Sequence, residues 1–87
     1  MSRHQVPGLY YKHKIFVGWN QELQTFFVQA IDKNKEYLGF HKSSVLYKGL
    51  VFREIEHIKD LQEELKPFAS LHNLMIHRLE KDKDEGA

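Results

Sequence analysis

The hydrophobic pattern of this chain changes once, near residue 54, from strand-like to helical, and this change limits the fold class. Before it, residues 9–17 and 23–31 are rich in aromatic and β-branched side chains with partial alternation, which is typical of strands. Residues 18–22 and 32–35 supply turns, and residues 36–41 predict a short third strand interrupted by Gly39. Residues 45–53 predict a fourth strand with a bulge at Gly49, with an irregular crossover as the alternative.

A helical stripe follows the change of pattern. Its apolar members, spaced three or four residues apart, are Ile55, Ile58, Leu61, Leu65 and Phe68. Pro67 lacks a backbone donor, so the helix should end or kink there, and residues 71–79 predict a second helix with Ser70 as its N-cap. Strands followed by helices predict an α+β fold: an antiparallel sheet of three or four strands followed by two C-terminal helices packed on one face.

The length of the chain, 87 residues, allows one domain. We expect residues 1–87 to form this domain, with residues 1–8 and 81–87 flexible. The sequence has no cysteine, which excludes disulfides and cysteine-ligated metals and fits a reducing compartment, the cytoplasm. No apolar run approaches the roughly 18 residues of a membrane span, and no secretory signal is recognisable. We therefore expect no membrane partner.

Both faces of the expected sheet carry apolar side chains, although two short helices can cover only one of them. An uncovered apolar face is typical of an interface. We therefore expect a small non-enzymatic protein-interaction or regulatory module that forms a homodimer or binds another protein. The expected interface residues are Tyr10, Tyr11, Phe16, Trp19, Phe26 and Val28. The sheet could instead curl around a small core, or residues 42–53 could cover the second face, and a register shift of one residue would swap the two faces.

Charge divides unevenly along the chain. Residues 1–53 contain eight basic and three acidic residues, whereas residues 54–87 contain five basic and nine acidic ones. A basic, aromatic sheet could stack single-stranded bases, so the alternative function is a nucleic-acid-binding protein. The residues expected to bind in that case are Lys12, Lys14, Lys33, Lys35, Lys42, Lys48 and Arg53. The same asymmetry also fits complementary layers within the domain.

Motifs that carry catalytic chemistry are missing from the sequence. There is no nucleophile elbow and no glycine-rich phosphate loop. Glu63 and Glu64 are adjacent on a helix and are poorly placed to share a proton. His72 and His77 are five residues apart, whereas helical ligand pairs are usually four apart. We expect no catalytic residue, no cofactor and no metal, although the pattern leaves open a site assembled from distant histidines.

One segment carries a resemblance. Residues 17–29, Val-Gly-Trp-Asn-Gln-Glu-Leu-Gln-Thr-Phe-Phe-Val-Gln, resemble the front segment of short uncharacterised bacterial proteins with the pattern V-G-W/Y-D/N-x-x-L-x-T-F-F. A later helix in those proteins resembles residues 53–61, so the resemblance covers about half of the chain. It implies a bacterial or mobile-element origin, and it brings no activity and no site residues with it.

Overall fold

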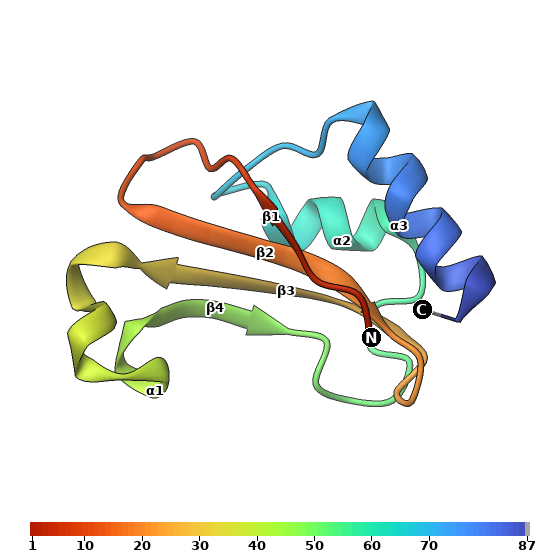
Figure 1. Ribbon diagram of the computed structural model, residues 1–87, viewed down its shortest axis with the longest axis horizontal. Coiled ribbons are helices and arrows are strands. Elements are labelled where there is room, and N and C mark those ends of the chain that lie inside the picture. The colour runs from red at the N-terminus through yellow and green to blue at the C-terminus, as the bar shows by residue number, and fades with distance from the viewer. Residues whose placement is uncertain (87) are drawn as a thin grey trace.

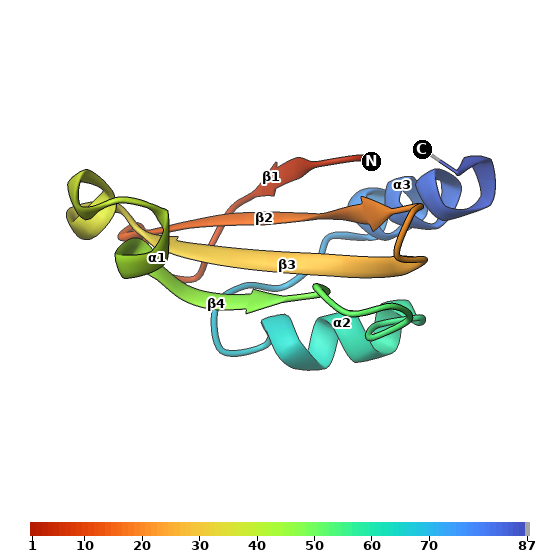
Figure 2. The ribbon, with the colours of Figure 1, turned by 90° about the horizontal axis from the view of Figure 1, so that it is seen from below.

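Four strands form one antiparallel sheet in the order β1-β2-β3-β4, so that each strand pairs with its neighbour in the sequence (Figure 1). The computed structural model describes residues 1–86, with the backbone only at residues 40 and 41. The strands are β1 (His4–Val6), β2 (His13–Asn20), β3 (Thr25–Asp32) and β4 (Ser44–Lys48). Figure 2 shows them side by side in this order. The expected antiparallel sheet is confirmed, with four strands.

Two helices follow the sheet and pack on the same face of it, α2 (Ile58–Leu65) and α3 (Asn73–Glu85) (Figure 1). A 3₁₀ helix, η1 (Lys33–Leu38), and one turn of helix, α1 (Phe40–Ser43), connect β3 to β4. The first of the two C-terminal helices ends at Leu65, two residues before Pro67, as the missing backbone donor of proline predicts. The α+β class with two C-terminal helices is therefore confirmed.

The hydrophobic core lies between the sheet and these two helices. The strand residues that face it are, in cross-strand pairs, Ile15 with Ala30, Val17 with Val28, and Trp19 with Phe26. Leu61 and Leu65 of α2 and Leu79 of α3 pack against them and are fully buried. Burying one such large apolar side chain is worth about 1.5–3 kcal/mol, so this layer is the main source of stability.

The segment between β4 and α2 is fastened to the sheet at Thr25. The hydroxyl Oγ1 of Thr25 accepts a hydrogen bond from the amide of Ile55 at 2.8 Å. The amide of Phe26 donates to the carbonyl oxygen of Ile55 at 2.8 Å. Ile55, the first residue of the apolar stripe, is therefore held in the core by strand contacts, and α2 begins three residues later at Ile58.

The strand expected at residues 36–41 is wrong, because this segment is helical in the structure. The carboxylate of Asp32 accepts a hydrogen bond from the amide of Asn34 at 2.9 Å and turns the chain directly after β3. Tyr37 and Leu38 are 84% and 44% exposed, so neither side chain is buried against the sheet. Gly39 then adopts a φ of +94°, which redirects the backbone toward α1.

Other element boundaries also differ from the expectation. The first long strand begins at His13 rather than residue 9, because residues 10–13 form a turn in which the amide of His13 donates to the carbonyl of Tyr10 at 3.1 Å. The last strand ends at Lys48 rather than residue 53, because Gly49 has a φ of +94°. The three-residue strand β1 was not predicted, since so short a segment shows no alternation.

The start of α3 corrects a predicted cap. Its N-cap is His72 and not Ser70, because the Nδ1 atom of His72 accepts a hydrogen bond from the amide of Leu74 at 3.2 Å. The helix also continues past residue 79 to Glu85 and ends at Gly86, which has a left-handed φ of +68°. Ala87, the last residue of the tail expected to be flexible, lies outside the described residues.

Candidate functional site

The second face of the sheet carries no helix, and we call it the helix-free face. It consists of alternate residues on the four strands, opposite to those that line the core. The residues directly paired across its centre are Phe16 on β2, Gln29 on β3 and Tyr47 on β4. Phe16 and Tyr47 are half-buried, whereas Gln29 is completely buried. At its centre the face therefore has a polar side chain with one aromatic ring on each side of it.

Next to this row, the ring of Phe27 lies across β2 at Gly18. A Cβ atom at Gly18 would lie 2.6 Å from the ring of Phe27 and would also collide with the carbonyl oxygen of Ser2. Residues 1–3 continue the edge of the sheet beside Trp19, where the amide of Ser2 donates to the carbonyl oxygen of Trp19 at 3.0 Å. Met1 and Arg3 lie on the helix-free face, because they line one hollow together with Phe27 and Tyr47. Phe27 is only 4% exposed, although no helix covers it. The missing side chain of Gly18 is what allows this packing.

Arg3 covers the centre of the helix-free face. Its guanidinium carbon lies 4.0 Å from the centroid of the Phe16 ring, which is a stacked cation–π arrangement. The Nη2 atom of Arg3 donates a hydrogen bond to Oε1 of Gln29 at 3.1 Å. The Nε2 atom of Gln29 is buried and has no hydrogen-bond partner among the described residues. An unpaired buried amide of this kind costs about 1–3 kcal/mol of stability.

Five of the seven basic residues expected to bind nucleic acid gather at one end of the sheet. They are Lys12, Lys14, Lys33, Lys35 and Lys42, at the start of β2, on η1 and on α1. Lys12 and Lys33 are neighbours, because the amide of Lys33 donates to the carbonyl oxygen of Lys12 at 2.7 Å. Two acids, Asp32 and Glu36, lie among them, and the Nζ atom of Lys14 is 2.7 Å from the carboxylate of Glu36. This end of the molecule is therefore basic.

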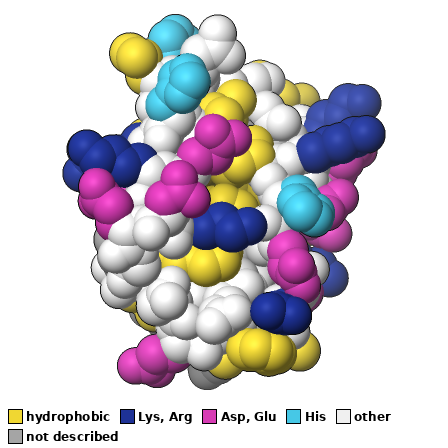
Figure 3. Space-filling view, turned by 90° about the vertical axis from the view of Figure 1, so that its right-hand side faces the viewer, with side chains coloured by type: hydrophobic (Ala, Val, Ile, Leu, Met, Phe, Trp, Pro, Cys, Tyr) yellow, Lys and Arg dark blue, Asp and Glu magenta, His cyan; other side chains and the backbone are white. Residues whose placement is uncertain are grey.

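The other two basic residues lie elsewhere. Lys48 is exposed on the edge strand β4. Arg53 belongs to the opposite end of the molecule, where its Nε atom is 4.0 Å from the carboxylate of Glu56. Figure 3 views that end and shows side chains of both charges interspersed over it. Arg53 is therefore not part of the basic end.

The six residues expected to form an interface do not share one surface. Trp19, Phe26 and Val28 are at most 4% exposed and lie in the core beneath the helices, which corrects the expectation that they form a docking surface. The hairpin register places them on the face that the helices cover, and the sequence left that choice open. Tyr10 and Tyr11 are exposed in the loop before β2. Only Phe16 lies on the helix-free face.

The sequence did not single out Arg3, Gln29 or Tyr47. A signal for Gln29 exists, because it is one polar residue within the apolar segment Phe26-Phe27-Val28-Gln29-Ala30 at the centre of a strand. A polar side chain in a buried strand needs a partner, and this requirement marks the position as unusual. Arg3 carried no such signal, since the contact that places it spans 26 residues of sequence.

A second polar cluster fastens β1 to α3. The Nε2 atom of His4 lies 2.7 Å from Oδ2 of Asp82, which is 5% exposed. Burial raises the pKa of Asp82, but hydrogen bonds from His4 and Ser2 and the positive charges of His4 and Arg78 outweigh it and hold the pKa below its ordinary value. The contact of Asp82 with His4 connects the first strand to the last helix, and its contact with Arg78 lies within that helix.

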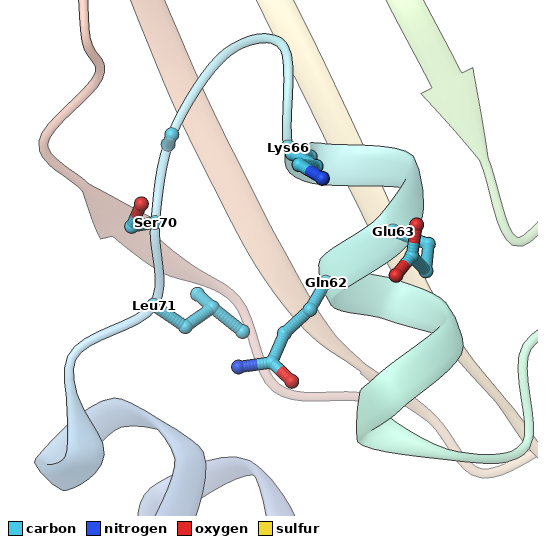
Figure 4. Close-up of a pocket in the computed structure, with 6 residues that line it drawn as sticks. Gln62, Glu63, Lys66, Ser70 and Leu71 are labelled. Carbon is cyan, nitrogen blue, oxygen red and sulfur yellow. The ribbon is translucent and has the colours of Figure 1, made fainter.

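The pockets of the described surface are shallow. One hollow of about 240 Å³ lies between the end of α2 and the connection to α3. Figure 4 shows that Gln62 extends across this hollow toward Leu71, while Ser70 points away from it. A second hollow, of about 310 Å³, lies beside Trp19, where the Nζ atom of Lys83 donates to the carbonyl oxygen of Glu56 at 2.7 Å. Ser70 makes no side-chain hydrogen bond with Glu63 or Lys66 in the first hollow, and among the described residues no hydroxyl side chain lines the second.

The described residues form neither a metal-binding cluster nor a membrane-spanning helix. Among the side chains that the structure describes, which leave out His41, no three histidine or acidic groups come close enough to hold a metal ion. No helix within residues 1–86 is long and apolar enough to cross a membrane. Comparison with protein-family models, with curated proteins and with solved structures returned no match.

Proposed function

We propose that this protein is a non-enzymatic binding module that binds single-stranded nucleic acid on its helix-free sheet face. The observation that carries the proposal is the row of Phe16, Gln29 and Tyr47, covered by the guanidinium of Arg3 and continuous with the lysine-rich end of the sheet. Aromatic rings on an open sheet can stack bases, and neighbouring cations can bind the phosphates. The cytoplasm remains the proposed compartment.

The distribution of charge supports an anionic ligand over a second copy on this face. Acidic residues concentrate in the last 34 residues, which form the helical layer on the far side of the sheet. Two copies packed through the centres of their helix-free faces would bring their two Arg3 guanidinium groups toward each other. Like charges that meet across an interface lower its affinity. An anionic strand meets no such repulsion.

Titration of short labelled oligonucleotides, followed by fluorescence anisotropy at several salt concentrations, tests the proposal. We expect binding that weakens steeply as salt rises, because phosphate contacts release counterions. Replacing Lys12 and Lys33 by glutamate should weaken binding to all sequences. The slope of the logarithm of the affinity against the logarithm of the salt concentration should also become shallower, by about one for each phosphate contact that is lost. The matched control is the double variant Lys59→Glu with Lys66→Glu, two exposed lysines on α2 and at its end, on the other layer. Salt-independent binding, or equal effects in both variants, would contradict the proposal.

A second candidate function is self-association, which a different surface favours. Leu50, Val51 and Phe52 are consecutive and 56–64% exposed, in a turn after β4. The carboxylate of Glu54 holds this turn rigid, because its Oε1 atom accepts hydrogen bonds from the amides of residues 49, 50 and 51 at 3.0–3.3 Å. Ordered apolar side chains of this kind are typical of protein interfaces.

Analytical ultracentrifugation over a range of concentrations tests self-association. A dimer that forms through this turn should dissociate in the variant Phe52→Ser, while the control Tyr37→Ser, an exposed aromatic residue on η1, should leave it intact. A wild-type protein that sediments as a monomer at every concentration would rule this candidate out.

A further inference from the structure

The side-chain amide of Gln29 lies at the centre of the helix-free face, and its hydrogen bonds are incomplete. Gln29 is 0% exposed and lies on the inner strand β3, between Phe16 and Tyr47 in register. Its oxygen accepts from Arg3, but its Nε2 atom has no partner among the described residues. Buried side-chain amides in native proteins nearly always have partners, so an unpaired N–H at this place requires an explanation.

The position of Arg3 suggests what the missing partner is. The guanidinium group is planar; it stacks on Phe16 and donates one hydrogen bond to the oxygen of Gln29. A nucleic-acid base is also planar and can stack on the same ring. A base that carries an amino donor beside a ring acceptor would satisfy both ends of the amide, whereas arginine has donors only and leaves Nε2 unpaired. Adenine has this pair of groups, and glutamine is its usual side-chain partner.

We propose that Gln29 is a specificity-determining residue that reads the edge of an adenine base stacked at Phe16, and that Arg3 occupies this position until the base replaces it. Displaced from Phe16, the guanidinium is free to bind a phosphate of the same strand. This inference rests on the proposed binding of single-stranded nucleic acid. It adds a base preference, which neither the basic end of the sheet nor the aromatic rings would provide.

The test uses the full-length protein, the variant Gln29→Met and the control Gln5→Met. Methionine matches the length of glutamine but has no amide, and Gln5 is an exposed glutamine that pairs with Phe16 on the same face. Binding of oligo-dA and oligo-dT is measured at one salt concentration. We expect wild-type protein and Gln5→Met to prefer oligo-dA by about tenfold, within the range of one bidentate contact, and Gln29→Met to bind both oligomers equally.

Thermal unfolding of the same variants separates a ligand-reading role from a structural one. Gln29→Met removes the unpaired N–H of the amide, which favours stability, and also removes the acceptor of the Arg3 hydrogen bond, which opposes it. The melting temperature should therefore stay close to that of the wild type. A clear fall in melting temperature would show that the amide is structural and would overturn the inference. Should that variant fail to fold, the side-chain amide signal of Gln29 in an NMR spectrum of the wild-type protein provides the readout, and it must shift when oligo-dA is added.

The outcomes distinguish the inference from the proposed function. Binding of both oligomers with an unchanged preference in Gln29→Met would overturn the inference and leave nucleic-acid binding in place. Failure of every oligomer to bind would overturn both. A shift of the Gln29 amide signal with a poly-glutamate peptide and not with oligo-dA would identify an acidic peptide as the ligand and would also overturn the inference.

Discussion

At the scale of single residues, this fold depends on a few positions where a side chain meets the backbone of a distant segment. Gly18 is one, because the ring of Phe27 and the carbonyl oxygen of Ser2 fill the space of its missing side chain. Asp82 is another, because it connects the last helix to His4 near the start of the chain. Each contact joins segments that are distant in the sequence, and no local sequence pattern predicts that they meet.

Replacing Gly18 by alanine should destabilise the protein by about 1–3 kcal/mol, the usual cost of forcing an atom into a packed site. The added Cβ would lie 2.6 Å from the Phe27 ring, so either the ring or residues 1–3 must move. Chemical denaturation measures the loss of stability, and the double variant Gly18→Ala with Phe27→Leu should recover part of it. An unchanged denaturation midpoint in Gly18→Ala would show that this close packing is not present in solution.

Asp82 predicts a loss of stability in acid. Its folded-state pKa lies below the ordinary value of 3.8, so the carboxylate stabilises the fold fully above that value. This contribution is lost as the pH falls through the folded-state pKa, where Asp82 takes up a proton. We therefore measure denaturation midpoints from neutral pH downward. Below pH 3.8 the midpoint should fall less steeply with pH in Asp82→Asn than in the wild type. Asp84→Asn, an exposed change on the same helix, should reproduce the wild-type curve.

At the scale of elements, side-chain hydrogen bonds define where several strands and helices begin or end. The carboxylate of Asp32 begins the turn after β3, and the imidazole of His72 caps α3. The carboxylate of Glu54 holds the turn after β4. Each of these groups satisfies backbone amides that would otherwise lack partners at the end of an element. The lengths of the elements are therefore set by local polar contacts as well as by the apolar pattern.

The variant Glu54→Ala should loosen the turn after β4. The amides of residues 49, 50 and 51 would lose their acceptor. A hydrogen bond to a charged group contributes about 1.5–3 kcal/mol to stability when it is shielded from water, and less when it is exposed. Hydrogen exchange should quicken at these three amides by more than it does in β2 and β3. Glu56→Ala, a change two residues away that removes no amide acceptor of this turn, is the control. Equal exchange in both variants would contradict the proposed role of Glu54.

At the scale of the whole molecule, the two ends of the sequence meet on the sheet and complete it. Met1 and Arg3 lie on the helix-free face, and His4 contacts Asp82 of the last helix. The helical layer is acidic, and the lysine-rich end lies on the side of the sheet elements. The molecule therefore has a covered acidic side and an open side with basic and aromatic groups, which is the basis of the proposed function.

Deletion of residues 1–3 should uncover the helix-free face without removing a strand. Phe27 and Gln29 would become accessible, so the truncated protein should bind a hydrophobic dye such as ANS more strongly than the full chain does. Its unfolding midpoint should fall, because the hydrogen bonds from Ser2 and Arg3 to the sheet can no longer form. Unchanged dye binding would indicate that these residues do not cover the face in solution.

Much of the fold follows from local pattern, and most of the candidate site does not. The hairpin of β2 and β3, the helical stripe and its end before Pro67 each leave a repeated signal in neighbouring residues. The helices at residues 33–43 were predicted as a strand and a turn, because capping by Asp32 decides their conformation and apolar residues there stay exposed. Of the row at the centre of the helix-free face, the sequence identified Phe16 alone, as an aromatic residue in a strand.

The sequence by itself determined the α+β class, the order of sheet and helices, and the uneven charge, because these depend on residue type and spacing within short windows. Only the tertiary structure decided which sheet face the helices cover, since one residue of register separates the two choices. That decision placed Trp19, Phe26 and Val28 in the core and left Phe16, Gln29 and Tyr47 on the open side. It also brought Arg3 onto Gln29, a contact across 26 residues that no local pattern encodes.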